Sequence, residues 1–293
     1  MKSVLLPSSI RIGLIKSLND ILESIDKLSD EDSEICFDFS EVEWISGEMT
    51  TLLGMEMRRL QFTGHILYST GMSPRIKNIL NKNGFNTLLL DHPKAEDIYN
   101  TTIPYTEISS NALSDINNYI DSIVFNKLNK TLVHATEQRF KEAVFEIADN
   151  THIHSNSNQI YMCGQHFPQK QSLAFTIADN GISIPVKVNN ALHAYTKNVS
   201  SHDTDLIDWA TKQGNSTKDV PAAGLGLSDI INTMKQLGEL TIVSNYGYWK
   251  LNSSNTLVKH HLNFPLHGTL IHFNFLLEKN FYTPTDNSAI LSF

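Results

Sequence analysis

The stretch that decides the fold is FEIADNTHIHS, which runs from Phe145 to Ser155 in the middle of the chain. It closes a helical pattern in which apolar residues recur every three or four positions. Glu146, Asn150 and His154 follow one another in steps of four, so they share a stripe of the predicted helix that is roughly 80° wide and ~12 Å long. A carboxylate, a carboxamide and an imidazole on one stripe indicate a polar site. A solvated helix face that ends in a capping Asn would have the same pattern.

The composition is that of a globular chain of 293 residues without a basic excess. Lys and Arg number 23 against 31 Asp and Glu, a net charge of -8, so neither nucleic acid nor an anionic membrane is expected as a main partner. The 41% hydrophobic content is too high for disorder, and no apolar run approaches the roughly 18 residues of a membrane-spanning helix. The two cysteines, Cys36 and Cys163, give no disulfide framework, which predicts a cytoplasmic protein.

The first hundred residues alternate between helical and strand patterns, which predicts a small α/β layer. The predicted helices cover residues 12–28, 47–60 and 74–80, and the predicted strands cover residues 34–39 and 65–69. Residues 91–112 are poorer in apolar side chains and contain two prolines, so a domain boundary is expected there. The predicted division is 1–105, 112–278 and a C-terminal tail over 279–293.

Residues 37–47, with the sequence FDFSEVEWISG, resemble part of a STAS domain, the fold of anti-sigma-factor antagonists. The resemblance covers residues 30–90. In signalling members of that family an Asp-Ser pair starts the helix after this strand, and the Ser is phosphorylated. Here Ser46-Gly47-Glu48 stands in that place, so the acceptor pair is not reproduced. Ser46 and Ser40 are candidate acceptors, and helix capping is the alternative role for Ser46.

Three more polar or Gly-rich patterns follow the opening stretch. The predicted strands of this half cover residues 158–163, 172–178, 239–244 and 268–275. The second strand runs into Asp179-Asn180-Gly181, and the last one begins with Gly268-Thr269. Between them lies a long segment without pattern, residues 186–223, and then Gly224-Leu225-Gly226 opens a predicted helix. A Gly-rich loop before a helix can hold phosphate on its N–H groups, although each of these patterns alone also fits a simple turn.

The order of these patterns resembles the GHKL ATPase superfamily, which includes DNA gyrase B, MutL and histidine kinases. The resemblance covers residues 130–276. The matching residues are Glu146, Asn150 and His154 for the N box, Asp179 and Gly181 for the G1 box, Gly224 and Gly226 for the G2 box, and Gly268-Thr269 for the final motif. The chain departs from the family at Ser183, where the G1 box has a glycine. If φ is positive at that position, Ser183 would hold the turn with some strain.

The resemblance implies an α/β protein in which a STAS-like domain precedes a Bergerat-type two-layer sandwich that binds ATP between helices and sheet. Asp179 is expected to accept a hydrogen bond from the adenine amino group, with Thr269 in support. Asn150 is expected to ligate Mg²⁺, and Glu146 to orient or deprotonate the attacking water. Residues 186–223 would form the ATP lid. The remaining nucleotide contacts are assigned to Gly181, Ser183, Lys218, Gly224, Leu225, Gly226 and Leu227, with Lys212 as a further candidate, whereas His154 receives no role.

Three functions are compatible with this resemblance. In the first, Mg²⁺-dependent ATP hydrolysis drives a conformational or interaction switch that acts on a protein partner or through a homodimer. In the second, the chain is a protein serine kinase that resembles anti-sigma-factor kinases. In the third, it is an interaction module that binds ATP without hydrolysing it. Glu146 favours the first two, and the missing Asp-Ser pair favours hydrolysis. A histidine kinase is disfavoured because His134 lacks the acidic neighbour of an acceptor histidine.

Overall fold

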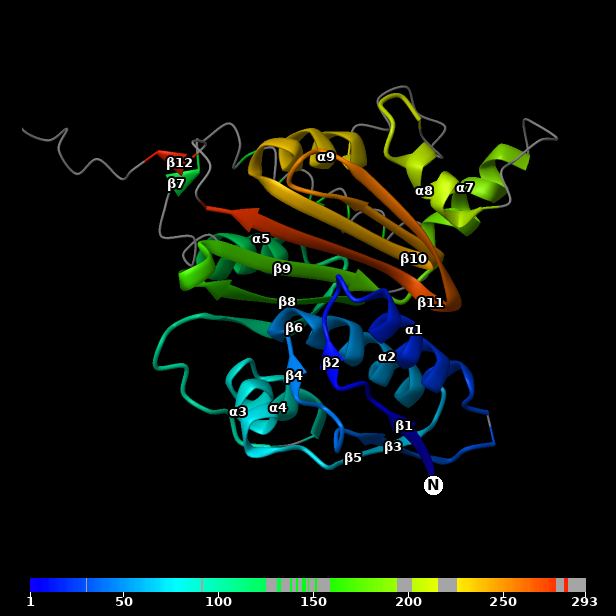
Figure 1. Cartoon of the computed structure of the whole chain (residues 1–293), viewed down its shortest axis with the longest axis vertical. Helices are drawn as coiled ribbons and strands as arrows, with labels where there is room; N and C mark the ends of the chain where they lie inside the picture. The colour runs from blue at the N-terminus through cyan, green and yellow to red at the C-terminus, as the bar shows by residue number, and fades with distance from the viewer. Residues whose placement is uncertain are drawn as a thin grey trace, which may run out of the picture.

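The computed structural model has a mixed α/β fold built on a three-stranded and a five-stranded sheet (Figure 1). The α/β class predicted from the sequence is thereby confirmed. The structure describes residues 1–29, 31–90, 92–124, 131–132, 138, 141, 144–145, 147, 151, 159–193, 202–215, 226–277 and 282–283.

The N-terminal unit is a three-stranded parallel sheet in the order β1-β3-β5, with helices packed beside it. Its elements are β1 (Lys2–Leu5), β2 (Ser9–Ile10), α1 (Ile15–Asp26), β3 (Glu34–Asp38), β4 (Trp44–Ile45), the 3-10 turn η1 (Gly47–Met49), α2 (Thr50–Phe62), β5 (Ile66–Thr70), α3 (Pro74–Lys82) and α4 (Phe85–Leu90). The Ser73 hydroxyl caps α3 by accepting from the Ile76 N–H at 3.4 Å, and Gly84, with φ +82°, follows the end of that helix. All helices and strands predicted for this unit are present, with shifted ends.

The larger sheet is antiparallel and has the strand order β10-β11-β9-β8-β6. Its strands are β6 (Thr102–Ser109), β8 (Gln159–Phe167), β9 (Ser172–Asp179), β10 (Gly238–Leu251) and β11 (Leu257–Leu276). A hairpin joins β8 to β9 and turns through η4 (Pro168–Lys170), and Gln171 takes a left-handed conformation with φ 43°. β6 was not predicted, and it crosses residue 105, the expected end of the first domain. Thr102, Pro104 and Thr106 lie on one side of β6. With these residues the segment has too few apolar positions to be recognised as a strand from its sequence.

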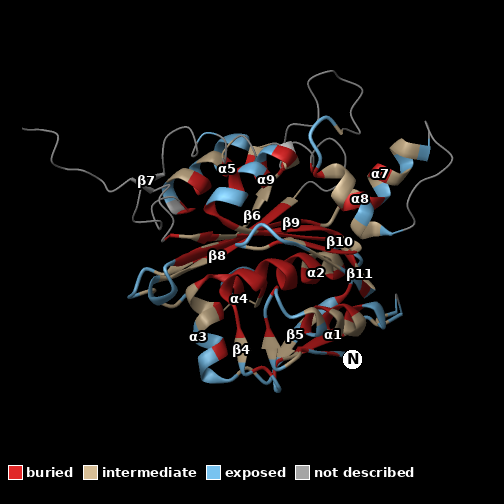
Figure 2. Cartoon of the chain, turned by 45° about the horizontal axis from the view of Figure 1, so that its top comes forward, coloured by how far each residue is buried: buried red, intermediate tan, exposed pale blue. Residues whose placement is uncertain are grey.

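Helices α5 (Leu113–Tyr119) and α9 (Gly226–Leu237) lie on one face of the five-stranded sheet, and the N-terminal helices α1 and α2 lie on the other (Figures 1 and 2). A π-helical turn, η2 (Ile120–Val124), continues α5, and a short antiparallel pair joins β7 (Thr131–Leu132) to β12 (Tyr282–Thr283). Val144 and Ile147, on the predicted helix of the opening stretch, are buried in the core between sheet and helices. That helix therefore directs its apolar stripe at the same face.

Two helices overlap residues 186–223, a segment whose sequence shows no periodic pattern. They are α7 (Ile184–His193), which begins two residues before that segment, and α8 (Asp203–Ala210), and neither was predicted. In α8, Asp203 and Asp205 occupy the first turn, where carboxylates favour a helix start. Only Leu206 and Ile207 of α8 are buried, so the apolar repeat is too short to produce a periodic signal.

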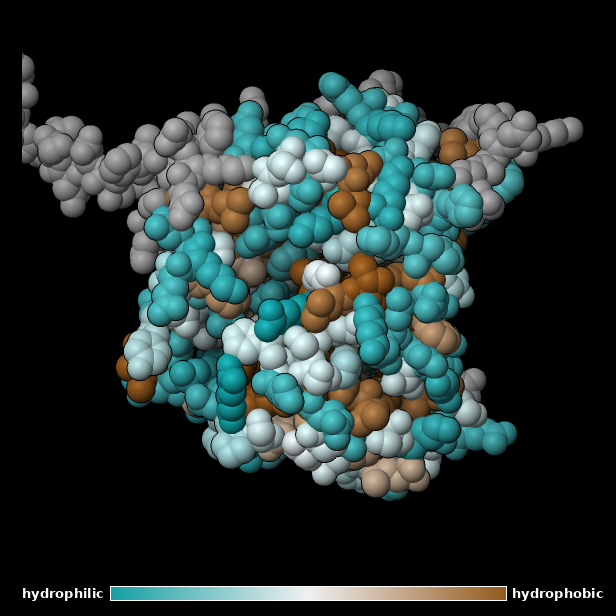
Figure 3. Space-filling view, viewed as in Figure 1, coloured by the Kyte–Doolittle hydropathy of each residue, from teal (hydrophilic) through white to brown (hydrophobic). Residues whose placement is uncertain are grey.

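Two hydrophobic cores lie on opposite faces of the five-stranded sheet. Side chains along β8 alternate between them, so that Ile160 and Met162 belong to one core, while Tyr161 and Cys163 belong to the other. The core that contains Tyr161 and Cys163 also includes apolar residues of β1, β3, α1 and α2. The N-terminal unit and the sheet therefore share one hydrophobic core. In Figure 3, apolar residues also gather at the level where this unit meets the sheet.

Polar contacts accompany this shared core at the start of α2. In η1, the Gly47 N–H donates to Oε1 of Gln165 at 3.2 Å, and the Cys163 thiol donates to the Gly47 carbonyl oxygen at 3.3 Å. Further along, the Arg58 Nε–H lies 2.8 and 2.9 Å from the two carboxylate oxygens of Glu107 on β6. The residues that correspond to the STAS phosphoacceptor region thus form part of the contact with β8.

The two candidate phosphate acceptors differ in accessibility. Ser46 is 7% exposed, directly before η1, whereas Ser40 is exposed at the end of β3. A kinase could reach Ser46 only after a local change of structure that exposes this side chain. Among the described residues, no helix combines the length and the apolar character that crossing a membrane requires.

Candidate functional site

The candidate site is centred on Asp179, the last residue of β9. β9 is the middle strand of the five-stranded sheet and is buried along its whole length, and Asp179 is 8% exposed. Its Oδ1 accepts from the Gly181 N–H at 2.9 Å, which closes a tight turn at the strand end. Its Oδ2 accepts from the Thr151 hydroxyl at 3.4 Å. The turn at Gly181 and the hydroxyl of Thr151 therefore hold the carboxylate from two sides.

Burial raises the pKa of Asp179 to about 6. The hydrogen bonds from Gly181 and Thr151 and the charge of Lys187 favour the ionised form and limit the rise. The carboxylate is thus mostly ionised at neutral pH inside an apolar sheet, which is a costly arrangement. Costly buried charges concentrate at functional sites, so this observation makes Asp179 the strongest candidate in the described part of the chain.

Thr269 lies next to Asp179, as we expected from the sequence. The two residues are register partners on β11 and β9, and Thr269 is 7% exposed. Its hydroxyl is 2.8 Å from the Ser244 hydroxyl on β10. Ser244 in turn donates to the Gly268 carbonyl oxygen at 3.1 Å and accepts from the Ile184 N–H at 3.0 Å. This chain of hydroxyls fixes the first residue of α7 to the end of the sheet.

Gly268 is required by the close approach of β9. Its φ is +125°, and a Cβ on it would lie 1.9 Å from the Asp179 carbonyl oxygen. No side chain fits at that distance, so the glycine sets how closely β11 can run beside Asp179. The Gly-Thr motif therefore has a steric basis at its first position and a hydrogen-bonding basis at its second.

Ser183 does not occupy a strained turn. It is absent from the described non-glycine residues with positive φ, so the conditional expectation of strain does not apply. Its hydroxyl accepts from the Val186 N–H at 3.4 Å and its carbonyl oxygen accepts from the Lys187 N–H at 3.1 Å, which is helix capping of α7. At this position Ser183 therefore acts as a helix cap, and the backbone there is not left-handed.

Several predicted site residues lie outside the described residues: Glu146, Asn150, His154, Lys218, Gly224 and Leu225, and also His134. The assignments made for them stay predictions. Gly226 and Leu227 begin α9, and Leu227 is half-buried against the core on the helical face of the sheet. Lys212 directs its ammonium at Oδ2 of Asp208, 3.2 Å away.

Two residues of the site were missed from the sequence. Thr151 is 2% exposed and bonds Asp179, and Ser244 is fully buried and bonds Thr269. Thr151 follows Ile147 by four residues on the apolar stripe, and a hydroxyl among apolar positions was the available signal. Ser244 ends the predicted strand 239–244, where a turn residue is unremarkable.

The histidines of β11 have structural surroundings. His272 is buried and lies 2.9 Å from the Thr176 hydroxyl, and burial lowers its pKa to about 4. His260 and His261 are exposed and lie beside Tyr248 and Tyr246. Within the described residues no group of three potential metal ligands occurs.

No protein-family model matches the chain, and none of the curated proteins matches it.

Proposed function

We propose that the chain is an ATP-binding protein of the GHKL superfamily with a Bergerat-type sandwich behind a STAS-like unit. The observation that carries the proposal is the buried Asp179 carboxylate at the end of β9, in register with Thr269 and close to the start of α7. The shape of the sheet supports it as well, because one face is covered by α5, α9 and the helix that contains Val144 and Ile147. The nucleotide would lie between this helical layer and the sheet.

The hydrogen bonds around Asp179 are compatible with adenine. Each carboxylate oxygen accepts one hydrogen bond from a described residue, and an ionised carboxylate oxygen can accept more than one. The exocyclic amino group of adenine is a donor, so an acceptor-only group at this position selects adenine over guanine, which carries a carbonyl oxygen there. Thr269 would support the same edge of the base, since its hydroxyl can both donate and accept.

The phosphate end is assigned by resemblance. Asn150 would ligate Mg²⁺ through its side-chain oxygen, and Gly224, Leu225, Gly226 and Leu227 would present N–H groups to the phosphates at the start of α9. Glu146 would orient or deprotonate the attacking water, and Lys218 would contact phosphate from the lid. Hydrolysis of ATP would then drive a conformational or interaction switch that involves a protein partner or a second copy.

The runner-up function is a protein serine kinase. The contact of η1 with β8 disfavours transfer to the chain's own Ser46, because that residue is buried there. Ser40 is accessible, so it is the acceptor to examine if the chain labels itself. A module that binds ATP without turnover is the third candidate.

Incubation of the full chain with γ-labelled ATP and Mg²⁺ separates these functions. We expect label to appear as free phosphate. The Glu146→Ala variant is expected to bind ATP without hydrolysing it, so that no labelled phosphate is released. Label on the protein would favour the kinase, with Ser40→Ala as the variant that removes it. ATP that is bound and left intact by the unmodified chain would favour the non-hydrolysing module.

A further inference from the structure

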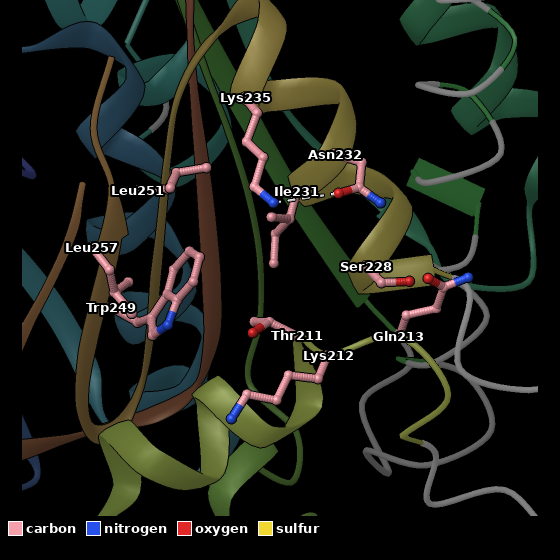
Figure 4. Close-up of a pocket in the computed structure, with 10 residues that line it drawn as sticks. All are labelled: Thr211, Lys212, Gln213, Ser228, Ile231, Asn232, Lys235, Trp249, Leu251 and Leu257. Carbon is pink, nitrogen blue, oxygen red and sulfur yellow. Dashed lines mark hydrogen bonds between the residues drawn. The ribbon is translucent and has the colours of Figure 1, made fainter. Parts of the chain in front are cut away.

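A pocket of about 380 Å³ lies on the helical face of the sheet, between the end of α8, the outer side of α9 and the edge of the five-stranded sheet (Figure 4). Its lining comes from three parts of the chain: Thr211, Lys212 and Gln213 after α8; Ser228, Ile231, Asn232 and Lys235 on α9; and Trp249, Leu251 and Leu257 on β10 and β11. None of these residues has a role in the ATP site proposed above except Lys212, which was a minor candidate.

One side of the pocket is apolar and rigid. Trp249 is 3% exposed and Leu251 is 4% exposed, and both belong to the core on this face. The indole of Trp249 is held in place because its Nε1–H donates to Oδ1 of Asp208 at 3.2 Å. Ile231 and the partly exposed Leu257 complete the apolar wall. Trp249 and Leu251 form the floor of the pocket, and most of the apolar surface that a ligand could cover here belongs to Leu257, which is 39% exposed.

The other side carries Lys235, whose ammonium is directed into the pocket in Figure 4. Lys235 is exposed, and its one hydrogen bond within the described residues is a long contact of 3.5 Å with Oδ1 of Asn232. No described carboxylate forms an ion pair with it. Asp229, six residues earlier on the same helix, is therefore not its counterion.

The acidic groups on the neighbouring elements are already engaged. Asp208 accepts from Trp249 and forms ion pairs with Lys212 and Lys259 at 3.2 and 3.3 Å. Glu239 pairs with Lys250 at 3.1 Å. Lys235 thus differs from the other lysine of the pocket, Lys212, which is neutralised by Asp208.

We propose that this pocket binds a small amphipathic anion, in which an apolar body packs on Leu257 above the floor formed by Trp249 and Leu251, and a single acid group meets Lys235. The volume lies within the range of small-molecule sites, and apolar walls with a few convergent polar groups are typical of them. A single ammonium without an ion pair suits a monocarboxylate or similar monoanion. It does not match the several charges of a nucleoside triphosphate, so the pocket is a site for another ligand.

The probe is octanoate, titrated calorimetrically into the full chain without nucleotide. We expect octanoate to bind with one site per chain and octanol, which has the same apolar body without the charge, to bind at least tenfold more weakly. Lys235→Met, which keeps the length of the side chain and removes the charge, is expected to weaken octanoate binding at least tenfold. Lys77→Met is the matched control, because Lys77 is an exposed lysine on α3, in the other unit.

The apolar wall is tested separately with Leu257→Ser, a change at a partly exposed position that leaves Lys235 in place. We expect a several-fold loss of octanoate affinity without loss of one-site behaviour. Absence of octanoate binding, equal affinity for octanol, or equal affinity of the Lys235→Met variant and the wild type would each overturn the proposal. None of these results depends on whether the chain binds ATP, because no nucleotide is present.

Discussion

At the scale of single residues, Asp179 combines a structural cost with a chemical use. The sheet encloses a carboxylate that water would solvate better, and only Gly181 and Thr151 among the described residues bond its oxygens. Its pKa is raised to about 6, so the folded chain binds a proton there more tightly than the unfolded chain does. Stability therefore falls as pH rises from about 4 through 6.

Asp179→Asn should increase the stability of the nucleotide-free chain at pH 7.5 while leaving it nearly unchanged at pH 4. The gain has an upper bound of about 3 kcal/mol, which corresponds to the rise in pKa, and urea unfolding at the two pH values measures it. Asp208→Asn is the opposite control. Burial acts to raise the pKa of Asp208, but its bonds with Trp249, Lys212 and Lys259 outweigh burial and lower it, so its loss should destabilise at pH 7.5. A destabilised Asp179→Asn chain at pH 7.5 would contradict this account of the site.

Gly268→Ala should destabilise the chain by at least about 2 kcal/mol, because the new methyl group would overlap the Asp179 backbone and the φ of +125° disfavours alanine. Gly64→Ala is the matched control. Gly64 also has a positive φ, +94°, but nothing lies near its missing Cβ, so the cost there is conformational only. Thermal unfolding compares the two variants, and an equal loss in both would show that close contact at Gly268 adds nothing.

The residues of the candidate site were predictable to different degrees. Asp179 and Thr269 stand beside turn glycines at strand ends, and that local pattern led to both. Their pairing depends on the register of β9 and β11, which joins residues ninety apart in sequence and leaves no local trace. Thr151 and Ser244 were missed because the sequence does not show their distant partners; the hydroxyl of Thr151 among apolar positions was the one local signal.

At the scale of elements, η1 is one of the places where the N-terminal unit contacts the five-stranded sheet. Glu48, in the middle of this turn, is 5% exposed, and burial raises its pKa to about 7. Bonds from its own backbone N–H and from Ser46, together with the charges of Lys170 and Arg11, limit the rise. Its Oε2 has no hydrogen-bond partner in the described structure. The contact between unit and sheet therefore includes a group that is unfavourable when ionised.

Glu48→Gln should remove a pH dependence from this contact. In the wild type, stability is expected to fall as pH rises from about 4.5 through 7, because the folded state holds its proton more tightly. The variant should be more stable than the wild type at pH 8.5, by on the order of 3 kcal/mol at most, and similar to it at pH 4. Urea unfolding at both pH values measures the difference. A variant less stable than the wild type at pH 8.5 would mean that the ionised carboxylate has a favourable partner.

Elements with a strong period were found from the sequence, and weakly patterned ones were not. α1, α2 and β9 carry long apolar repeats and were predicted, whereas β6 and α8 owe their existence to packing. β6 gains its place by pairing with β8, and α8 by packing two residues, Leu206 and Ile207, against the extended β10–β11 hairpin. Such elements are fixed by tertiary contact and not by local sequence.

At the scale of the whole molecule, the shared core means that the two predicted domains fold on a common surface. Side chains from α1 and α2 and from β8 and β11 belong to one cluster, and the sheet is covered on both faces. The composition shift at residues 91–112 indicated a boundary, but composition does not report what lies on the far face of a sheet.

Unfolding should accordingly occur in one cooperative transition. In a Trp44→Phe variant the remaining tryptophans, Trp209 and Trp249, report only the C-terminal half, whereas far-ultraviolet circular dichroism reports the whole chain. We expect the two signals to have the same urea midpoint. Separate midpoints would show that the N-terminal unit unfolds independently of the sheet.

The most direct test of the central claim is a calorimetric titration of the full chain with Mg²⁺ and ATP. We expect one site per chain, at least tenfold weaker binding of GTP, and no detectable ATP binding to Asp179→Asn, while Asp20→Asn on α1 binds ATP as the wild type does. ATP binding of unchanged affinity in the Asp179→Asn variant, with its fold intact, would contradict the claim that this carboxylate recognises adenine.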